Sequence, residues 1–393
     1  MRRITLKAKI RILVTAAAFL AATGTTAWAQ GPDTAQAVAR QVEQYNFSVH
    51  ILAMLLVGFG FLMVFVRKYG CAATTGTYLV VGAGIPLYLF LRSAGVLCAE
   101  PVAVHTVGAL LLAEFACASG LIAMGAVLGR IRTWQYALLA ALLVPAYLLN
   151  EWLVLDGGLG VTRGFVDAAG SVSIHAFGAY FGLGLAVALT RARHLRQPVE
   201  SDATSERFSM LGSMVLWMFW PSFCSAVVPA EQMPQAALNT VLALCGATLA
   251  TYFLSALLRH GRPSFGDMAN GALAGGVAVG ATCNVLAPAG AFVLGILAGA
   301  LCVVGYVAVQ PRLQARFRIL DTCGVHNLHG LPGLLGGLAA VLVFPGRAAA
   351  QLTGILVTVA LALATGLVGG LLIRVTGEKE SAYQDEDEFA LAD

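Results

Sequence analysis

Residues 321–333 read Asp-Thr-Cys-Gly-Val-His-Asn-Leu-His-Gly-Leu-Pro-Gly, which places one carboxylate and two imidazoles in a segment otherwise apolar enough to lie in a membrane. Upstream, residues 167–175 read Asp-Ala-Ala-Gly-Ser-Val-Ser-Ile-His. Both segments have a Gly three positions after the Asp and a His eight positions after it. A polar pattern that occurs once in each half of the chain predicts two structural repeats. Each repeat would bring one His, His175 or His329, to a shared site.

The composition of the chain is that of a membrane protein. Apolar residues make up 59% of the sequence and charged residues 11%, whereas charged residues make up about 25% of an ordinary soluble domain. The mean hydropathy is +0.81. The net charge of +4 is therefore no sign of nucleic-acid binding. We expect the chain to contact membrane lipid and no nucleic acid.

The first 29 residues have the pattern of a signal peptide. A basic start is followed by an apolar core over residues 12–22 and by the small-x-small cleavage pattern Ala27-Trp28-Ala29. The alternative is an uncleaved first helix. Cleavage after Ala29 would place Gln30 outside the membrane, with residues 30–47 as a periplasmic lead.

Apolar segments of membrane-crossing length follow one another after this lead. They cover about 48–66, 73–91, 103–128, 134–155, 168–189, 208–228, 236–258, 266–287, 290–309, 321–344 and 349–373. This pattern predicts an all-α polytopic membrane protein with eleven transmembrane helices, in a membrane domain over residues 48–374.

The basic residues test this helix count, because cytoplasmic loops are enriched in Lys and Arg. With the N-terminus outside, the breaks after odd-numbered helices contain fifteen basic residues and the outer segments four. The fifteen are Arg67, Lys68, Arg130, Arg132, Arg191, Arg193, Arg196, Arg207, Arg259, Arg262, Arg312, Arg316, Arg318, Arg374 and Lys379. We therefore expect a periplasmic N-terminus and a cytoplasmic C-terminus. Residues 375–393 form an acidic tail, and we expect its acidic run 385–388 to be disordered.

The odd number of helices also predicts how the repeats are related. If helices 1–5 (about 48–189) and 6–10 (about 208–344) are the two repeats, they begin on opposite sides of the membrane. They must then be inverted copies, as in many transporters. Each His lies eight residues inside its segment, or about 12 Å at helical rise, so the two approach the midplane from opposite faces. Helix 11, about 349–373, is an extra element.

The polar residues inside these segments have structural and functional interpretations. Asp167 and Asp321 each open a helix, where a carboxylate caps free N–H groups, and we favour this role over direct contact with a solute. For His175 and His329 the repeat relation favours a pathway over a structural role. His326 has no counterpart in the first repeat, and it either lines the inner mouth or packs.

Two other kinds of site find little support in the sequence. Neither His lies in an HxxxH or Cys/His cluster with acidic ligands, so a metal site is disfavoured. No Gly-x-Ser-x-Gly elbow occurs, and no nucleophile–base arrangement indicates an enzyme. We expect no catalytic residue, no metal and no cofactor.

Four segments carry a more specific pattern: Gly-Ser-Val-Ser-Ile-His-Ala-Phe-Gly-Ala-Tyr-Phe-Gly-Leu (170–183), Trp-Met-Phe-Trp-Pro-Ser-Phe-Cys-Ser-Ala (217–226), Asn-Gly-Ala-Leu-Ala-Gly-Gly-Val-Ala-Val-Gly (270–280) and residues 321–330. They closely resemble the Rhesus (Rh) branch of the ammonium transporter/Rh superfamily, over roughly residues 45–375. The resemblance implies an eleven-helix protomer with an inverted five-helix repeat, a pore through each protomer and a homotrimer. A signal peptide on an Rh protein indicates the inner membrane of a Gram-negative bacterium.

The resemblance also implies roles for single residues. His175 and His329 match the twin histidines of the pore, and Phe115 and Phe223 match the stacked phenylalanines that close its outer end. Glu151 matches an acidic residue of the outer vestibule. Val227 stands where the transporter branch has a serine that helps to bind ammonium, so the resemblance does not imply a high-affinity external site. An insertion before Asp167 is a second departure from the family pattern.

The function that follows is a passive ammonia channel. A cation in a narrow apolar pore must shed its water at high cost, whereas neutral ammonia loses far less. A carbon dioxide channel is the nearest alternative, and methylammonium is a further candidate solute. An ammonium sensor is a third possibility, although the tail after Arg374 has only 19 residues, too few for a signalling domain.

Overall fold

Helices form wherever the sequence predicts a membrane crossing. The computed structural model describes residues 35–98 and 103–390, and within these ranges the chain forms helices and connecting loops without a β-strand. Nine helices in the described ranges are long and apolar enough to cross a membrane. The other two predicted crossings are α8 (Ala203–Ser225), which is continuous, and the segment of α10 (Phe265–Gly271), α11 (Ala274–Val279) and η7 (Gly280–Thr282), which is broken.

The remaining helices give one segment for each predicted crossing. In chain order they are α2 (Ala35–Ala53) with η1 (Met54–Phe59), α3 (Gly60–Leu62) and η2 (Met63–Phe65); α4 (Gly70–Ser93); α5 (Val107–Ala126); α6 (Gln135–Val154); η4 (Ser171–Ala176) with α7 (Phe177–Leu189); α9 (Met233–Leu258); α12 (Pro288–Val304) with η8 (Gly305–Val309) and α13 (Gln310–Phe317); η9 (His326–Gly330) with α14 (Leu331–Val343); and α15 (Ala348–Val375). The protein is therefore an all-α polytopic membrane protein.

The start of the chain differs from the prediction. The polar lead expected over residues 30–47 is helical from Ala35 onward, because it is rich in Ala and Gln, which favour helix. Residues up to Val42 belong to a separate N-terminal unit, and the description that follows concerns the unit from Glu43 onward. The predicted signal peptide, residues 1–29, lies outside the described residues.

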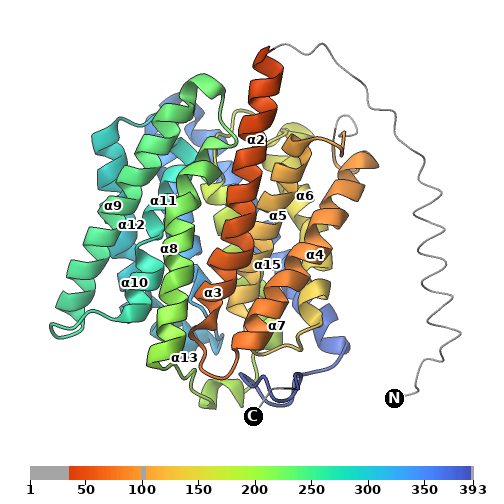
Figure 1. Ribbon diagram of the computed structural model, residues 1–393, viewed down its shortest axis with the longest axis vertical. Coiled ribbons are helices and arrows are strands. Elements are labelled where there is room, and N and C mark those ends of the chain that lie inside the picture. The colour runs from red at the N-terminus through yellow and green to blue at the C-terminus, as the bar shows by residue number, and fades with distance from the viewer. Residues whose placement is uncertain (1–34, 99–102, 391–393) are drawn as a thin grey trace, which may run out of the picture. The chain divides into compact units, whose positions relative to one another are not determined.

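The two halves of this unit pack in the same way; in Figure 1, α4, α5 and α6 of the first half lie on the right and α8, α9 and α12 of the second half lie on the left. In the first half the second helix packs on the fourth (α4 on α6), and the third packs on the fifth (α5 on α7). The corresponding pairs of the second half are α9 on α12 and α11 on α14. Arg67, which follows η2, lies 3.6 Å from Asp202, the residue that caps the start of α8. The first helix of one half therefore ends where the first helix of the other begins, as an inverted repeat requires.

Close approach of helices depends on small residues. A Cβ atom at Gly295 of α12 would lie 2.0 Å from the Ala243 carbonyl oxygen of α9, and one at Gly366 of α15 would lie 2.1 Å from the Phe181 carbonyl oxygen of α7. Only glycine fits at these positions, which lets backbones pack where the lipid offers no hydrophobic driving force. The extra helix α15 is thus held tightly against the first half.

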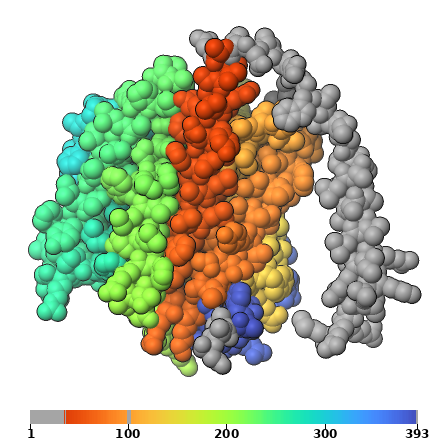
Figure 2. Space-filling model, in the orientation of Figure 1, coloured from red at the N-terminus to blue at the C-terminus, as the bar shows by residue number. Residues whose placement is uncertain are grey.

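The prediction that the acidic run 385–388 is disordered is wrong. The Asp385 carboxylate accepts hydrogen bonds from the backbone N–H groups of Cys71 and Ala72, both at 2.8 Å, and so caps the start of α4. The Glu388 carboxylate accepts one from the Thr133 N–H at 2.9 Å. In Figure 2 this blue segment lies against the lower end of the orange α4. Free helix N–H groups attract carboxylates, but a local sequence pattern does not show that a distant helix supplies them.

Charged loops gather at the end of the unit that the tail covers. We call this end the basic end: it carries the loops that follow η2, α5, α7 and α9, together with the tail. Glu378 of the tail pairs there with Arg191 and with Arg193, whose nitrogen lies 3.1 Å from the carboxylate. Hydrogen bonding and pairing with Arg191 lower the pKa of Glu378 below its ordinary value. The basic residues of these loops thus share one end, as the sequence pattern predicts.

Candidate functional site

The two His residues occupy matching backbone turns. Gly170 and Gly324 have φ values of +75° and +71°, the left-handed conformation that glycine adopts without strain. A wide π-helical turn follows each, η4 with His175 in its last turn and η9 with His329 in its last turn. The repeated Asp, Gly and His spacing thus produces the same local structure twice.

Both Asp residues cap these turns. The Asp167 carboxylate accepts hydrogen bonds from the N–H groups of Val172 (3.0 Å) and Ser173 (2.7 Å). The Asp321 carboxylate accepts three, each at 3.0 Å, from the backbone of residues 324, 325 and 326. These contacts are those of the capping role that the sequence favours. Neither carboxylate pairs with a basic side chain within the described residues.

The structure brings His175 and His329 together. Their Nδ1 atoms lie 3.3 Å apart, and the rings are nearly parallel at 10°, with centroids 5.4 Å apart. Both residues are buried, at 3% and 4% exposure. A hydrogen bond between two imidazole nitrogens needs one N–H and one bare nitrogen, so the pair shares a single proton at this contact. The Nε2 atom of His175 is buried and has no partner among the described residues.

An aromatic group covers the His175 side of the pair. Phe223 lies 5.8 Å from His175 between ring centroids, and Phe115 lies 4.6 Å from Phe223. The stacking implied by the resemblance is wrong, because the two phenylalanine rings meet at 75°, edge to face. The ring quadrupoles favour this arrangement over a face-to-face sandwich.

Two aromatic residues at the site were missed by the sequence interpretation. Trp220 stacks on His175 at 5.5 Å, and Phe59 of η1 stacks on His329 at 6.1 Å. Trp220 lies three residues before Phe223 on α8 and therefore shares its helix face, a signal that spacing alone offered. Phe59 carries no such signal, because only tertiary packing brings the first helix beside the tenth segment.

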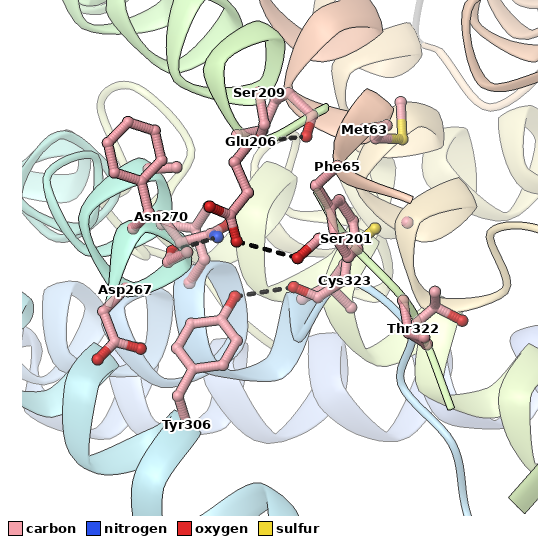
Figure 3. A pocket seen from close by; sticks show the side chains of 18 of the residues that line it. Met63, Phe65, Ser201, Glu206, Ser209, Asp267, Asn270, Tyr306, Thr322 and Cys323 are labelled. Carbon is pink, nitrogen blue, oxygen red and sulfur yellow. Dashed lines mark hydrogen bonds between the residues drawn. The ribbon is translucent and has the colours of Figure 1, made fainter. Parts of the chain in front are cut away.

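A cavity of about 310 Å³ adjoins the other side of the pair. His329 and Phe59 belong to its lining, and its polar lining includes Ser201, Glu206, Asp267, Asn270 and Thr322 at the basic end. Figure 3 shows the hydroxyl of Ser201 bonded to Glu206, at 2.9 Å, and the Tyr306 hydroxyl bonded to the Cys323 carbonyl oxygen, at 2.8 Å. The pair is therefore covered by aromatic rings on one side and adjoins an open volume on the other.

Glu151, which the resemblance matches to an acidic residue of the outer vestibule, is buried. The residue is 7% exposed, and its carboxylate accepts a hydrogen bond from the Tyr88 hydroxyl at 2.9 Å. Arg92 lies 4.0 Å from the same oxygen and 3.7 Å from Asp156, whose side chain is more exposed. A buried carboxylate is stabilised by such partners, and the sequence did not reveal them because they come from α4.

His326 is set apart from the pair. It lies edge-on against Tyr180 at 5.8 Å, and its Nδ1 is buried without a partner among the described residues. It is not among the residues that line the cavity, so of its two expected roles the structure favours packing. No group of three or more His, Cys, Asp or Glu in the described ranges could hold a metal ion.

Comparisons with known proteins agree with this architecture. A family model described as Ammonium Transporter Family matches residues 10–392. The ammonium transporter Rh type B of Oryctolagus cuniculus is 39% identical over 356 residues, which cover 82% of this chain and 76% of the relative. The ammonium transporter Rh type A of Canis lupus familiaris is 38% identical over 310 residues, which cover 78% and 73%.

Solved structures support the same assignment. The structure of Nitrosomonas europaea Rh50 is 65% identical, with a TM-score of 0.89 over 91% of this chain and 94% of that one. A structure described as a sensor Amt protein has a TM-score of 0.74 at 18% identity, over 86% and 93%, and shows the shared fold alone. The chain therefore belongs to the Ammonium Transporter Family, in its Rh branch, and is a transporter rather than an enzyme.

Proposed function

We propose that this protein is a passive channel that conducts neutral ammonia across the cytoplasmic membrane. The observation that carries this proposal is one unbroken series of contacts: Phe115 on Phe223, Phe223 near His175, His175 on His329, and His329 on the cavity at the basic end. The names of the relatives, ammonium transporters of the Rh type, indicate the same solute.

The chemistry of the series favours ammonia over its cation. The two phenylalanines exclude bulk water, so a permanent cation would lose its hydration without replacement ligands. Ammonia is neutral and needs only one or two hydrogen bonds. The buried Nε2 of His175, which lacks a protein partner among the described residues, offers such a bond. Sodium and potassium have no proton to leave behind and remain charged.

The assembly and the location belong to the same proposal. We expect a homotrimer with one pore per subunit, in the inner membrane of a Gram-negative bacterium. The basic end then faces the cytoplasm, because cytoplasmic loops carry the excess of Lys and Arg, and the Phe115 and Phe223 side faces the periplasm. Native mass spectrometry in mild detergent tests the assembly, and a stable monomer would contradict it.

Stopped-flow uptake into proteoliposomes tests the conduction. Purified protein is exposed to an ammonia gradient and, in a parallel series, to a carbon dioxide gradient, with internal pH as the readout. We expect faster alkalinisation with ammonia than in protein-free vesicles. If only the carbon dioxide rate increases, the protein is a carbon dioxide channel and the proposal is wrong.

A further inference from the structure

A fully buried cation lies in the loop between α5 and α6. Arg130 is 3% exposed. Its Nε donates to the Thr322 hydroxyl at 3.3 Å, and its Nη1 donates to the Thr190 hydroxyl at 2.9 Å. Its Nη2 donates to the carbonyl oxygens of Ala126 and Leu320. All of these acceptors are neutral, so the hydrogen bonds satisfy the guanidinium without cancelling its charge.

No carboxylate pairs with this guanidinium in the part of the chain that the structure describes. No Asp or Glu oxygen there lies within 4.0 Å of an Arg130 nitrogen. The nearby Asp321 directs its oxygens to three backbone N–H groups instead. Burial lowers the pKa of Arg130, but the ordinary pKa of arginine is so high that the group stays charged at neutral pH.

This charge lies directly behind the wall of the inner cavity. Thr322, which accepts the bond from Nε, lines the cavity together with Cys323 and His329. The Thr322 and Cys323 N–H groups donate to the carbonyl oxygens of Ala126 and Gly125, at 3.2 Å and 3.1 Å. Arg130 bridges the same two segments, because it donates to both the Ala126 carbonyl oxygen and the Thr322 hydroxyl.

The other charges around the cavity are engaged with partners. Asp267 pairs with Arg259 at 2.6 Å, and Glu206 accepts the hydrogen bond of Ser201 at 2.9 Å. Of these, Glu206, in the first turn of α8, is the acid whose partner is neutral. Nearer His329, the fixed positive charge behind the wall is that of Arg130, and the neighbouring Asp321 carboxylate is bound by the three backbone N–H groups at the start of the His329 turn.

We propose that Arg130 is a specificity-determining residue, whose buried positive charge disfavours cations in the inner cavity beside His329 while leaving ammonia unaffected. This inference rests on the proposed ammonia conduction and adds the exclusion of cations. The physical basis is that a charge surrounded by low-dielectric protein acts on a neighbouring cavity with little screening. Fixed positive groups exclude cations from other selective pores in the same way.

A substitution at Thr190 tests the charge without removing Arg130. Thr190→Asp places a carboxylate where the hydroxyl now accepts the Nη1 bond, and so neutralises the guanidinium; Thr190→Asn is the matched neutral control. With ammonium chloride, currents across a planar bilayer or a supported membrane are measured beside ammonia uptake. We expect the ammonium current of Thr190→Asp to rise about tenfold over wild type, with Thr190→Asn unchanged and ammonia uptake similar in all three.

The outcomes separate this inference from the proposed function. If wild-type protein conducts no ammonia, the proposed function fails. If it conducts ammonia but Thr190→Asp passes no more current than Thr190→Asn, Arg130 does not determine specificity. If Thr190→Asp does not assemble, Arg130→Lys and Arg130→Gln are used instead. Both substitutions remove the guanidinium hydrogen bonds, but only Arg130→Gln removes the positive charge. A current that rises in Gln alone supports the inference, and equal currents overturn it.

Discussion

The segments around His175 and His329 share one backbone design and differ in their surroundings. Each has a capping Asp, a glycine with positive φ, and a π-helical turn that carries the His. His175 lies under Trp220 and Phe223, whereas His329 lies against Phe59 and lines a cavity of about 310 Å³. The inverted repeat thus gives the two His residues the same local backbone. The helices packed around them differ, so the His175 side is covered by aromatic rings and the His329 side adjoins a cavity.

The largest effect is expected when the pair itself is broken. His175→Ala or His329→Ala leaves the remaining imidazole short of a hydrogen bond, which costs roughly 1–3 kcal/mol. If this cost appears in the transport barrier, ammonia flux falls about 5- to 150-fold. The double variant should be no worse than either single one, because the two residues act as a unit. Flux is measured in proteoliposomes, with trimer content checked in parallel.

His326→Ala is the matched control for the pair, because His326 packs on Tyr180 away from the cavity lining. We expect a milder loss of flux than in either variant of the pair. Normal flux and selectivity in both single variants of the pair would show that the twin His are structural. The proposed mechanism would then be wrong.

Opening the closed side gives the next largest effect. Phe223→Ala removes the ring that lies between Phe115 and His175, so we expect a several-fold increase in the leakage of water or small ions. Phe59→Ala is the control, since Phe59 lies on the side that already adjoins the cavity. Osmotic shrinkage of proteoliposomes measures the leakage. Equal leakage in the two variants would mean that the aromatic cover does not distinguish the two sides.

A smaller effect is expected from the caps. Asp321 accepts three backbone hydrogen bonds and Asp167 accepts two. The loss of a helix cap typically costs about 0.5–2 kcal/mol, so Asp321→Ala should lower the unfolding temperature more than Asp167→Ala. The Asn variants retain an acceptor and should lose less. Thermal unfolding in detergent gives the comparison, and the reverse order of the two Ala variants would contradict it.

The smallest effect concerns the tail at the basic end. Burial alone would raise the pKa of Glu388, but hydrogen bonds from Thr133 and the charge of Lys379 outweigh it, and the pKa is lowered. A lowered pKa stabilises the tail contact above the unfolded pKa of about 4.3, and this stabilisation is lost as pH falls through the folded value. Glu388→Gln should therefore weaken the contact at neutral pH, by about 1–2 kcal/mol.

Hydrogen exchange of the tail measures this weakening. Glu386→Gln serves as the control, because the Glu386 side chain is exposed and makes no hydrogen bond or ion pair among the described residues. We expect faster exchange around residue 388 in Glu388→Gln and no change in ammonia flux. A large change in flux would mean that the cavity beside His329 depends on the tail. The difference between the His175 and His329 sides would then not come from the packing of the two halves alone.

The sequence by itself predicted the class of fold, the apolar segments and the shared position of the two His residues. It did so because these features depend on signals that are local or repeated. Runs of apolar residues report membrane crossings, Lys and Arg report the side of the loops, and the Asp, Gly and His spacing encodes a cap, a left-handed turn and an inward side chain. The resemblance to Rh proteins added Phe115 and Phe223.

Only the tertiary structure decided which groups surround these residues. The edge-to-face angle of the phenylalanines, the burial of Glu151 under Tyr88, and the docking of Asp385 on the start of α4 each join segments far apart in the chain. The partners of a buried polar group are chosen by packing, because an unpaired group in a low-dielectric interior is costly wherever its partner originates. Local spacing places His329 on its turn, and long-range packing places Phe59, the cavity and the charge of Arg130 around it.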